Sequence, residues 1–292
     1  MKWEGHEQSR NVEDRRGSPS GGGGGRLGGR GVGLGTIAVA LVAGWIFGIN
    51  PLTVLGLLSG DGLPGGGAVQ QAPAQATPGG DRNAAFVATV LRDTELVWGQ
   101  VFKGGGSTYR EPVLVLFRGA IPTACGTGQS AAGPFYCPGD SKVYLDLTFF
   151  DTLQRRLGAP GDFAQAYVVA HEVGHHVQML LGITGRVDAM RGRVSAAQMN
   201  EMSVRVELQA DCLAGLWAHH SQQGKGWLER GDIDEALNAA AQIGDDTLQR
   251  KGSGTVVPES FTHGTSQQRT SWFRRGLEGG SLAQCDTFDA KI

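Results

Sequence analysis

Apolar residues recur at helical spacing over two long stretches in the second half of the chain. The first covers residues 162–182: it follows a Gly/Pro-rich breaker, Asp162 is a suitable N-cap, and a glycine closes it. The second covers residues 195–220 and opens on a capping box, in which Ser195 and Gln198 can satisfy each other's backbone N–H groups. The pattern predicts two long helices with largely apolar middles.

Shorter patterns predict the remaining elements. Residues 112–117 form a continuous apolar run, typical of a buried strand, and residues 142–147 alternate like a half-buried strand. Further helices are expected over residues 81–102, 148–157, 232–244 and 265–277. Because the strands and helices do not alternate as βαβ units, we predict an α+β fold with a small β-sheet packed on helices.

The middle of the first long helix carries the sequence His171-Glu172-Val173-Gly174-His175. Positions four apart lie on one face of a helix, so His171 and His175 can bind one metal ion from two successive turns. Glu172 can then reach a metal-bound water without binding the metal, which is the H-E-x-x-H arrangement of zinc peptidases. The alternative is a pair of hydrogen-bonded core histidines, but imidazoles are costly to bury in an apolar helix without partners.

The second long helix supplies two further candidates, Glu207 and Asp211, again four residues apart on one face. Zinc that hydrolyses peptides commonly takes two histidines and a glutamate and leaves its fourth position for water. A metal-bound histidine normally donates its other N–H to a carboxylate or carbonyl. We therefore assign Glu207 as the third ligand and Asp211 as that acceptor. A solvated acidic helix face is the alternative, although the neighbouring residues are mostly apolar.

These motifs resemble those of the gluzincin branch of zinc peptidases. More narrowly, the chain resembles the bacterial membrane-anchored family called "putative neutral zinc metallopeptidase". The matching segments are residues 3–5, 11–17, 133–138, 143–146, 171–178, 207–214 and 261–265. The resemblance implies a zincin-like fold, in which the H-E-x-x-H helix and a second helix with the glutamate ligand pack on the small sheet after one transmembrane helix.

The motifs and the resemblance together imply a zinc-dependent metalloendopeptidase that hydrolyses extracytoplasmic proteins or peptides. One Zn²⁺ per chain would be held by His171, His175 and Glu207. Glu172 would act as the general base when water attacks the scissile carbonyl, and would pass the proton to the leaving amine.

The oxyanion that forms in this reaction needs a donor besides zinc. His263 is the first candidate, because it lies just before a predicted helix and within a matching segment, although an ordinary surface histidine is the alternative. Arg269 and Tyr144 are weaker candidates. In the peptidases that this chain resembles, an edge strand near the metal pairs with extended substrate, and residues 143–147 are either that strand or an ordinary core strand.

A function of a different class stays open. The domain could be a zinc-stabilised, catalytically silent module that is tethered to the membrane and binds envelope components or partner proteins. A fourth protein ligand in place of water would favour this alternative, and the sequence offers no obvious one. The sequence identifies neither the substrate nor the oligomeric state.

Residues 31–58 carry no charge and are long enough to cross a bilayer. Basic residues precede this stretch and the first charge after it is Asp61, so the positive-inside rule predicts a cytoplasmic N-terminus. A cleaved signal peptide is less suitable, because the preceding charged region is too long. In the plasma membrane of a bacterium we thus predict a cytoplasmic Gly/Arg-rich tail over residues 1–30, a transmembrane anchor over 31–58, a flexible Gly/Pro/Ala linker over 59–80 and an extracytoplasmic zinc metallopeptidase domain over 81–292.

The four cysteines agree with export. Cys125 and Cys137 bracket a short loop and could form one disulfide, which leaves Cys212 and Cys285 for a second. Four cysteines allow three pairings, so this pairing is a hypothesis. A second zinc site is less favoured, because no C-x-x-C spacing occurs. The formal net charge of −2 gives no reason to expect binding to nucleic acid.

Overall fold

The computed structural model describes residues 1–17 and 81–292. Its main sheet contains, in spatial order, β1 (Val12–Asp14), β2 (Val113–Leu116), β6 (Lys142–Leu145) and β5 (Phe135–Cys137). The first three of these are parallel, whereas β5 runs antiparallel to β6 at one edge. A separate hairpin is formed by β3 (Ala120–Thr123) and β4 (Gly126–Gln129).

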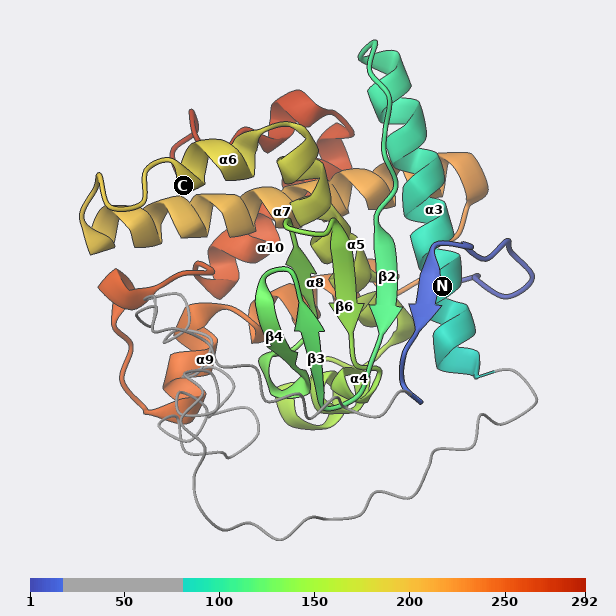
Figure 1. The fold of residues 1–292 in the computed structure, drawn as a ribbon, viewed down its shortest axis with the longest axis horizontal. Helices are drawn as coiled ribbons and strands as arrows, with labels where there is room; N and C mark the ends of the chain where they lie inside the picture. Colours follow the sequence, from blue (N-terminus) through green and yellow to red (C-terminus); the bar gives the residue numbers. More distant parts are fainter. Residues whose placement is uncertain (18–80) are drawn as a thin grey trace, which may run out of the picture.

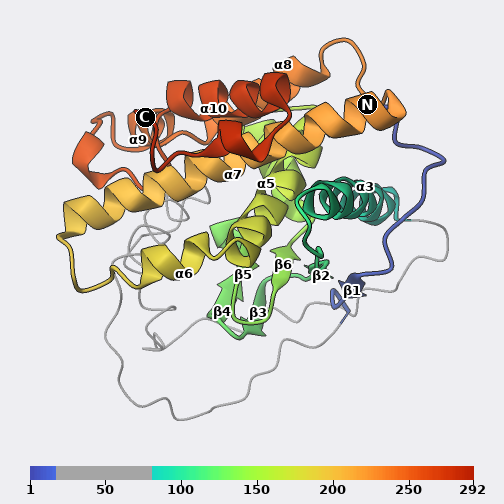
Figure 2. The same ribbon diagram turned by 90° about the horizontal axis from the view of Figure 1, so that it is seen from above.

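Most of the helices lie on one side of the main sheet, which Figure 1 shows face-on. In chain order they are α3 (Arg82–Gly104), α4 (Thr148–Thr152), the π-helical η2 (Leu153–Leu157), α5 (Asp162–Leu180), α6 (Ile183–Asp188), α7 (Ala196–Lys225), α8 (Asp232–Gln242), α9 (Asp245–Gly252) and α10 (Ser266–Gly279), with 3-10 turns η1 (Ser130–Ala132), η3 (Pro258–Ser260) and η4 (Leu282–Cys285). Figure 2 shows α3 and α5 next to the sheet, then α7, with α8 and α10 on the far side. The predicted α+β arrangement of a small sheet packed on helices is confirmed.

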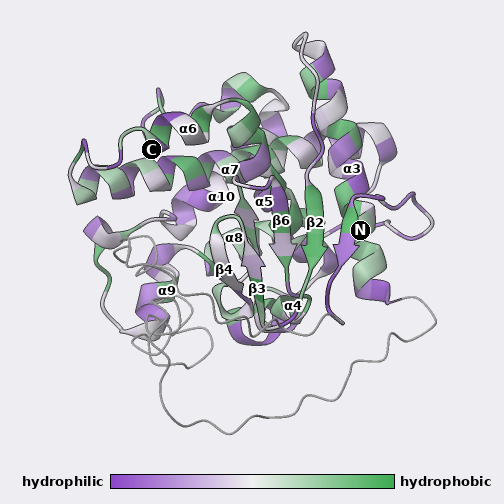
Figure 3. Cartoon of the chain, in the orientation of Figure 1, coloured by the Kyte–Doolittle hydropathy of each residue, from purple (hydrophilic) through white to green (hydrophobic). Residues whose placement is uncertain are grey.

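Helix α5 lies at the centre of these layers and contacts α3, α7, α8 and the sheet. Val173 and Val177 are fully buried, as is most of β2, which has the green colour of hydrophobic residues in Figure 3. At Gly174 the helix meets α7 so closely that an added Cβ would lie 3.1 Å from the carbonyl oxygen of Ala210. The glycine within H-E-x-x-H therefore allows close contact between the two helices that carry the predicted ligands.

Local signals at helix ends are largely confirmed. The carboxylate of Asp81 accepts hydrogen bonds from the first turn of α3, and capping boxes open α7 and α10 as predicted. At α5, however, the N-cap is Gly161 and Asp162 is the first helical residue. The carboxylate of Asp162 does not cap its own helix; it accepts a hydrogen bond of 2.8 Å from the α-ammonium of Met1.

Residues 1–17 belong to the same folded body as residues 81–292. β1 pairs with β2 in the main sheet, and Trp3 is buried edge-on against Phe86 of α3. The Gly/Arg-rich composition of residues 1–30 instead predicts a separate tail. A strand of three residues among polar neighbours has no apolar period that could distinguish it from a tail.

The described residues contain no helix long and apolar enough to span a membrane. The predicted anchor over residues 31–58 lies outside the described residues. A bilayer cannot separate adjacent strands of one sheet, so residues 1–17 and 81–292 must lie on the same side of any membrane in this structure. This fold is therefore incompatible with a cytoplasmic N-terminus joined by one crossing to an extracytoplasmic domain.

Candidate metal centre

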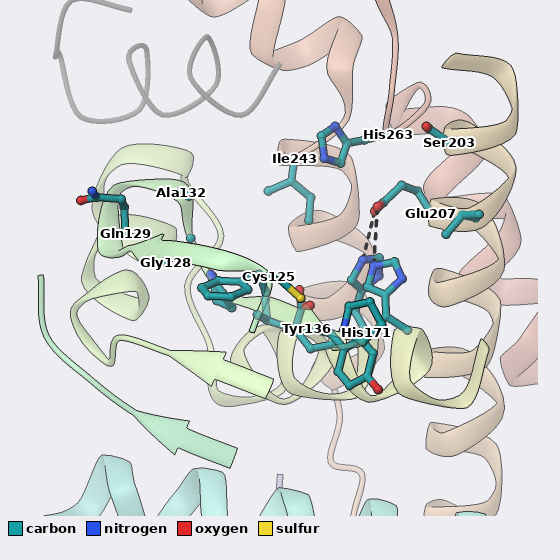
Figure 4. A pocket seen from close by; sticks show the side chains of 18 of the residues that line it. Cys125, Gly128, Gln129, Ala132, Tyr136, His171, Ser203, Glu207, Ile243 and His263 are labelled. Atoms are coloured by element: carbon teal, nitrogen blue, oxygen red, sulfur yellow. Dashed lines mark hydrogen bonds and ion pairs between the residues drawn. The ribbon is translucent and has the colours of Figure 1, made fainter. Parts of the chain in front are cut away.

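The structure brings the three predicted metal ligands together (Figure 4). Helix α5 presents His171 and His175 on one face, and the adjacent α7 presents Glu207 opposite them. Nε2 of His171 lies 3.2 Å from Oε2 of Glu207, and Nε2 of His175 lies 3.5 Å from Oε1. Two ligands of a tetrahedral zinc ion, each about 2.0 Å from the metal, are about 3.3 Å apart. The donor set and its spacing therefore fit zinc.

His171 is oriented by a buried network. Its Nδ1 lies 2.9 Å from Oδ1 of Asp211, the predicted acceptor, and Arg269 donates to both oxygens of Asp211 at 2.8 and 2.9 Å. The hydroxyl of Tyr167 also donates to Asp211. Burial alone would raise the pKa of Asp211, but the Arg269 guanidinium holds that pKa below its usual range. A charged Asp211 holds a proton on Nδ1 of His171, so Nε2, which faces Glu207, is the nitrogen available to a metal.

Burial by itself lowers the pKa of His171, but the carboxylates of Asp211 and Glu207 outweigh burial and raise the pKa to about 10. For Glu207, burial favours protonation, but the imidazoles of His175 and His171 hold its pKa well below the usual range. The same negative field that attracts a proton to these imidazoles attracts a metal cation. The site is thus electrostatically suited to a divalent ion.

Glu172 lies in the same cavity and is 8% exposed. Its pKa is raised mainly by burial, which outweighs the opposing effect of His175 and His171. A carboxylate with a raised pKa accepts a proton more readily than one in water, which suits a general base.

His263 lines the cavity from the loop before α10. In Figure 4 the side chain of Glu207 reaches between the rings of His171 and His263. Its Nδ1 lies 3.2 Å from Oδ1 of Asp245, and Oδ2 of Asp245 accepts from the backbone N–H groups of Thr262, His263 and Gly264. Burial would lower the pKa of His263, but the hydrogen bond to Asp245 raises it. Asp245 lies 18 residues from His263 along the chain and belongs to no motif, so the sequence gives no signal for it.

The two weaker candidates for oxyanion stabilisation differ in position. Arg269 borders the cavity but is 2% exposed, and its guanidinium is occupied by Asp211, Tyr167 and the carbonyl oxygen of Ile243. Tyr144 donates to Asp140 and is not among the residues that line the cavity in the described part of the chain.

Comparison with known proteins agrees with this site. The family described as "Putative neutral zinc metallopeptidase" matches residues 1–288. The chain belongs to this family. "Uncharacterized protein YpfJ" of Escherichia coli (strain K12) is 52% identical over 296 residues, which cover 100% of both chains. "Uncharacterized protein Rv2575" of Mycobacterium tuberculosis (strain H37Rv) is 42% identical over 229 residues, 74% of this chain and 75% of its own. No solved structure matches the chain.

Membership of this zinc metallopeptidase family implies zinc and a protein or peptide substrate, and the cavity has the size for the latter. Its volume is about 590 Å³, and its walls come from α5, α7, the β3–β4 hairpin and β5. β6, which contains most of residues 143–147, lies between β2 and β5 and is buried. Of the two alternatives for these residues, the ordinary core strand is therefore confirmed and the edge strand is wrong. The edge strand beside the cavity is β5, where Tyr136 donates to Nδ1 of His176 at 2.9 Å.

Both predicted disulfides are present. Cys125–Cys137 ties the turn of the β3–β4 hairpin to β5 beside the cavity, and Cys212–Cys285 ties the C-terminal segment to α7. All four cysteines of the chain are therefore paired.

Proposed function

We propose that this protein is a zinc-dependent metalloendopeptidase with a zincin-like active site. The observation that carries the proposal is the convergence of His171, His175 and Glu207 at tetrahedral spacing, with the buried Glu172 beside them. Family membership supports the same conclusion.

His171, His175 and Glu207 would hold the metal, one ion per chain. Zinc, when bound at such a site, lowers the pKa of water and polarises a carbonyl group. Glu172 takes the proton of the attacking water and passes it to the leaving amine. His263, whose pKa is raised by the hydrogen bond to Asp245 against the effect of burial, donates to the oxygen on which negative charge develops.

The free edge of β5 is suited to bind an extended peptide as an added strand. β5 has a partner on one side only among the described strands, and Tyr136 and Phe135 of this strand line the cavity. A substrate strand in this position would bring a peptide bond toward Glu172. β5 thus takes the role that the sequence suggests for residues 143–147.

We further propose that the domain, together with residues 1–17, lies outside the cytoplasm, and that residues 31–58 attach it to the membrane of a bacterium without carrying the chain to the other side. Two disulfides and no free cysteine support an oxidising compartment. The uncharged stretch over residues 31–58 supports attachment to the membrane.

The test is zinc content and peptide cleavage by the full-length protein against an unbiased peptide library. Glu172→Gln should retain one zinc per chain and lose at least about 100-fold in kcat/KM, because a general base contributes about 10²–10⁴-fold. Glu278→Gln, on the exposed face of α10, is the matched control and should retain full activity. Cleavage by Glu172→Gln at the wild-type rate would show that Glu172 is not the base.

The second candidate function is a zinc-stabilised, catalytically silent binding module tethered to the membrane. It would be favoured if wild type and Glu172→Gln each bound one zinc and neither cleaved any peptide. A protein without zinc would contradict both candidates.

A further inference from the structure

The second histidine of the motif is oriented by a different device from the first. Nδ1 of His175 lies 2.8 Å from Oε1 of Gln178, the neutral side chain that follows it by three residues on α5. Gln178 is fully buried, and its Nε2 donates to the carbonyl oxygen of Val206 at 2.7 Å and to Oε1 of Gln209 at 3.0 Å. Nε2 of Gln209 in turn donates to the carbonyl oxygen of Cys285 at 2.8 Å.

The direction of donation along this chain of hydrogen bonds is fixed at Cys285. A backbone carbonyl such as that of Cys285 can only accept, so Gln209 must present its amino group there and its oxygen to Gln178. Gln178 faces that oxygen and the carbonyl of Val206, so it must present its amino group to them and its own oxygen to His175. His175 must therefore carry its proton on Nδ1, which leaves the Nε2 lone pair facing Glu207.

The far end is also held in place mechanically. Cys285 is joined to Cys212 on α7 by a disulfide. The segment that follows is held through Arg205, whose guanidinium donates to the carbonyl oxygens of Thr287 and Ala290, while the hydroxyl of Thr287 donates to the carbonyl oxygen of Arg205. The C-terminal segment is thus a fixed acceptor rather than a loose tail.

We propose that Gln178 and Gln209 form an amide relay that sets the tautomer and ring orientation of His175 for metal binding, with the C-terminal segment as its anchor. The carboxylate of Asp211 can only present an oxygen to His171. The side-chain amide of Gln178 could present either its oxygen or its NH₂ group to His175, so the relay is needed to fix which of the two faces the ring. Both glutamines are therefore positioning residues. The inference rests on the proposed metal site and not on peptidase activity.

The relay is tested by zinc affinity, measured on full-length protein by competition with a fluorescent chelator. Gln178→Met keeps the volume and removes the acceptor, and we expect its affinity for zinc to fall about 10- to 100-fold, as for other partners of ligating histidines. Gln209→Met leaves the Gln178–Val206 bond in place and should lose less, about 3- to 10-fold. In ¹⁵N NMR spectra of the zinc-free wild type, His175 should be protonated on Nδ1, and Gln178→Met should show both tautomers.

Thr94→Val is the matched control, because it removes a buried hydrogen bond to the carbonyl oxygen of Leu91, away from the centre. It should lower thermal stability without changing zinc affinity. Wild-type zinc affinity in Gln178→Met, or an equal loss in Thr94→Val, would overturn the relay. If Gln178→Met does not fold, unchanged affinity in Gln209→Met would overturn it instead. Absence of zinc binding in the wild type would contradict the proposed metal site itself, which separates the two failures.

Discussion

The three imidazoles of the site differ in the chemistry of their partners. His171 and His263 each face an aspartate, whereas His175 faces the amide of Gln178. A carboxylate stabilises a positive imidazole far more than an amide does. His263 is not a proposed metal ligand, so a bound metal would not displace its proton. Its protonation should therefore be visible in the pH dependence of catalysis.

We expect Asp245→Asn to move the alkaline limb of kcat/KM to lower pH. The hydrogen bond to Asp245 raises the pKa of His263 against the effect of burial, so the charged donor is present at low pH and lost as pH rises through that pKa. Asparagine retains an oxygen for the backbone N–H groups but removes the charge, so the pKa of His263 should fall. Peptide cleavage measured from pH 5 to about 10 tests this shift.

The contribution of the His263–Asp245 pair to the free energy of unfolding should follow from the directions of their pKa shifts. For His263 it is fully present below the ordinary histidine pKa and disappears as pH rises through the raised value. Burial raises the pKa of Asp245, but its interaction with His263 outweighs burial and lowers that pKa. The contribution of Asp245 is therefore present above the ordinary aspartate pKa and disappears as pH falls through the lowered value.

An unchanged alkaline limb in Asp245→Asn would mean that His263 does not act as the charged donor.

At the scale of elements, the sequence was informative wherever the signal was local. The long helices, the capping boxes and the i,i+4 ligand pair all depend on residues within one or two turns of each other, so periodicity and motif suffice. β5 could not be recognised as the edge strand, because it has three residues and its place depends on its pairing with β6. Gln178 and Gln209 carry no motif, and their role arises from contacts between α5, α7 and the C-terminal segment.

The crossing of α7 and α10 gives a prediction at this scale. A Cβ added at Gly276 would overlap the carbonyl of Cys212 on α7, and one added at Gly215 would overlap the backbone of Phe273 on α10. Gly276→Ala should therefore force the two helices apart and lower the free energy of unfolding by about 1–3 kcal/mol, despite the better helix propensity of alanine. Chemical denaturation tests this, with Gly224→Ala as control because a Cβ there meets no atom within 4 Å. Equal stability of the two variants would contradict the close helix contact.

At the scale of the whole molecule, the first residues complete the fold from a distance. β1 forms one edge of the sheet, and the α-ammonium of Met1 contacts Asp162 at the start of α5 and Asp232 at the start of α8. These contacts connect the beginning of the chain to the helix that carries the H-E-x-x-H motif. A hydropathy pattern cannot reveal them, because it identifies an apolar stretch without showing which flanking segments pack together.

The consequence for topology can be measured with introduced cysteines, because all four native cysteines are in disulfides. Gln8 lies in the N-terminal segment and Gln154 in η2, and both are exposed. In right-side-out and inside-out membrane vesicles, a membrane-impermeant maleimide should label Gln8→Cys and Gln154→Cys in the same type of vesicle, because a shared sheet holds both positions on one side. Labelling of the two positions in opposite vesicle types would restore the single crossing predicted from charge and would mean that β1 does not pair with β2 in the membrane-bound protein.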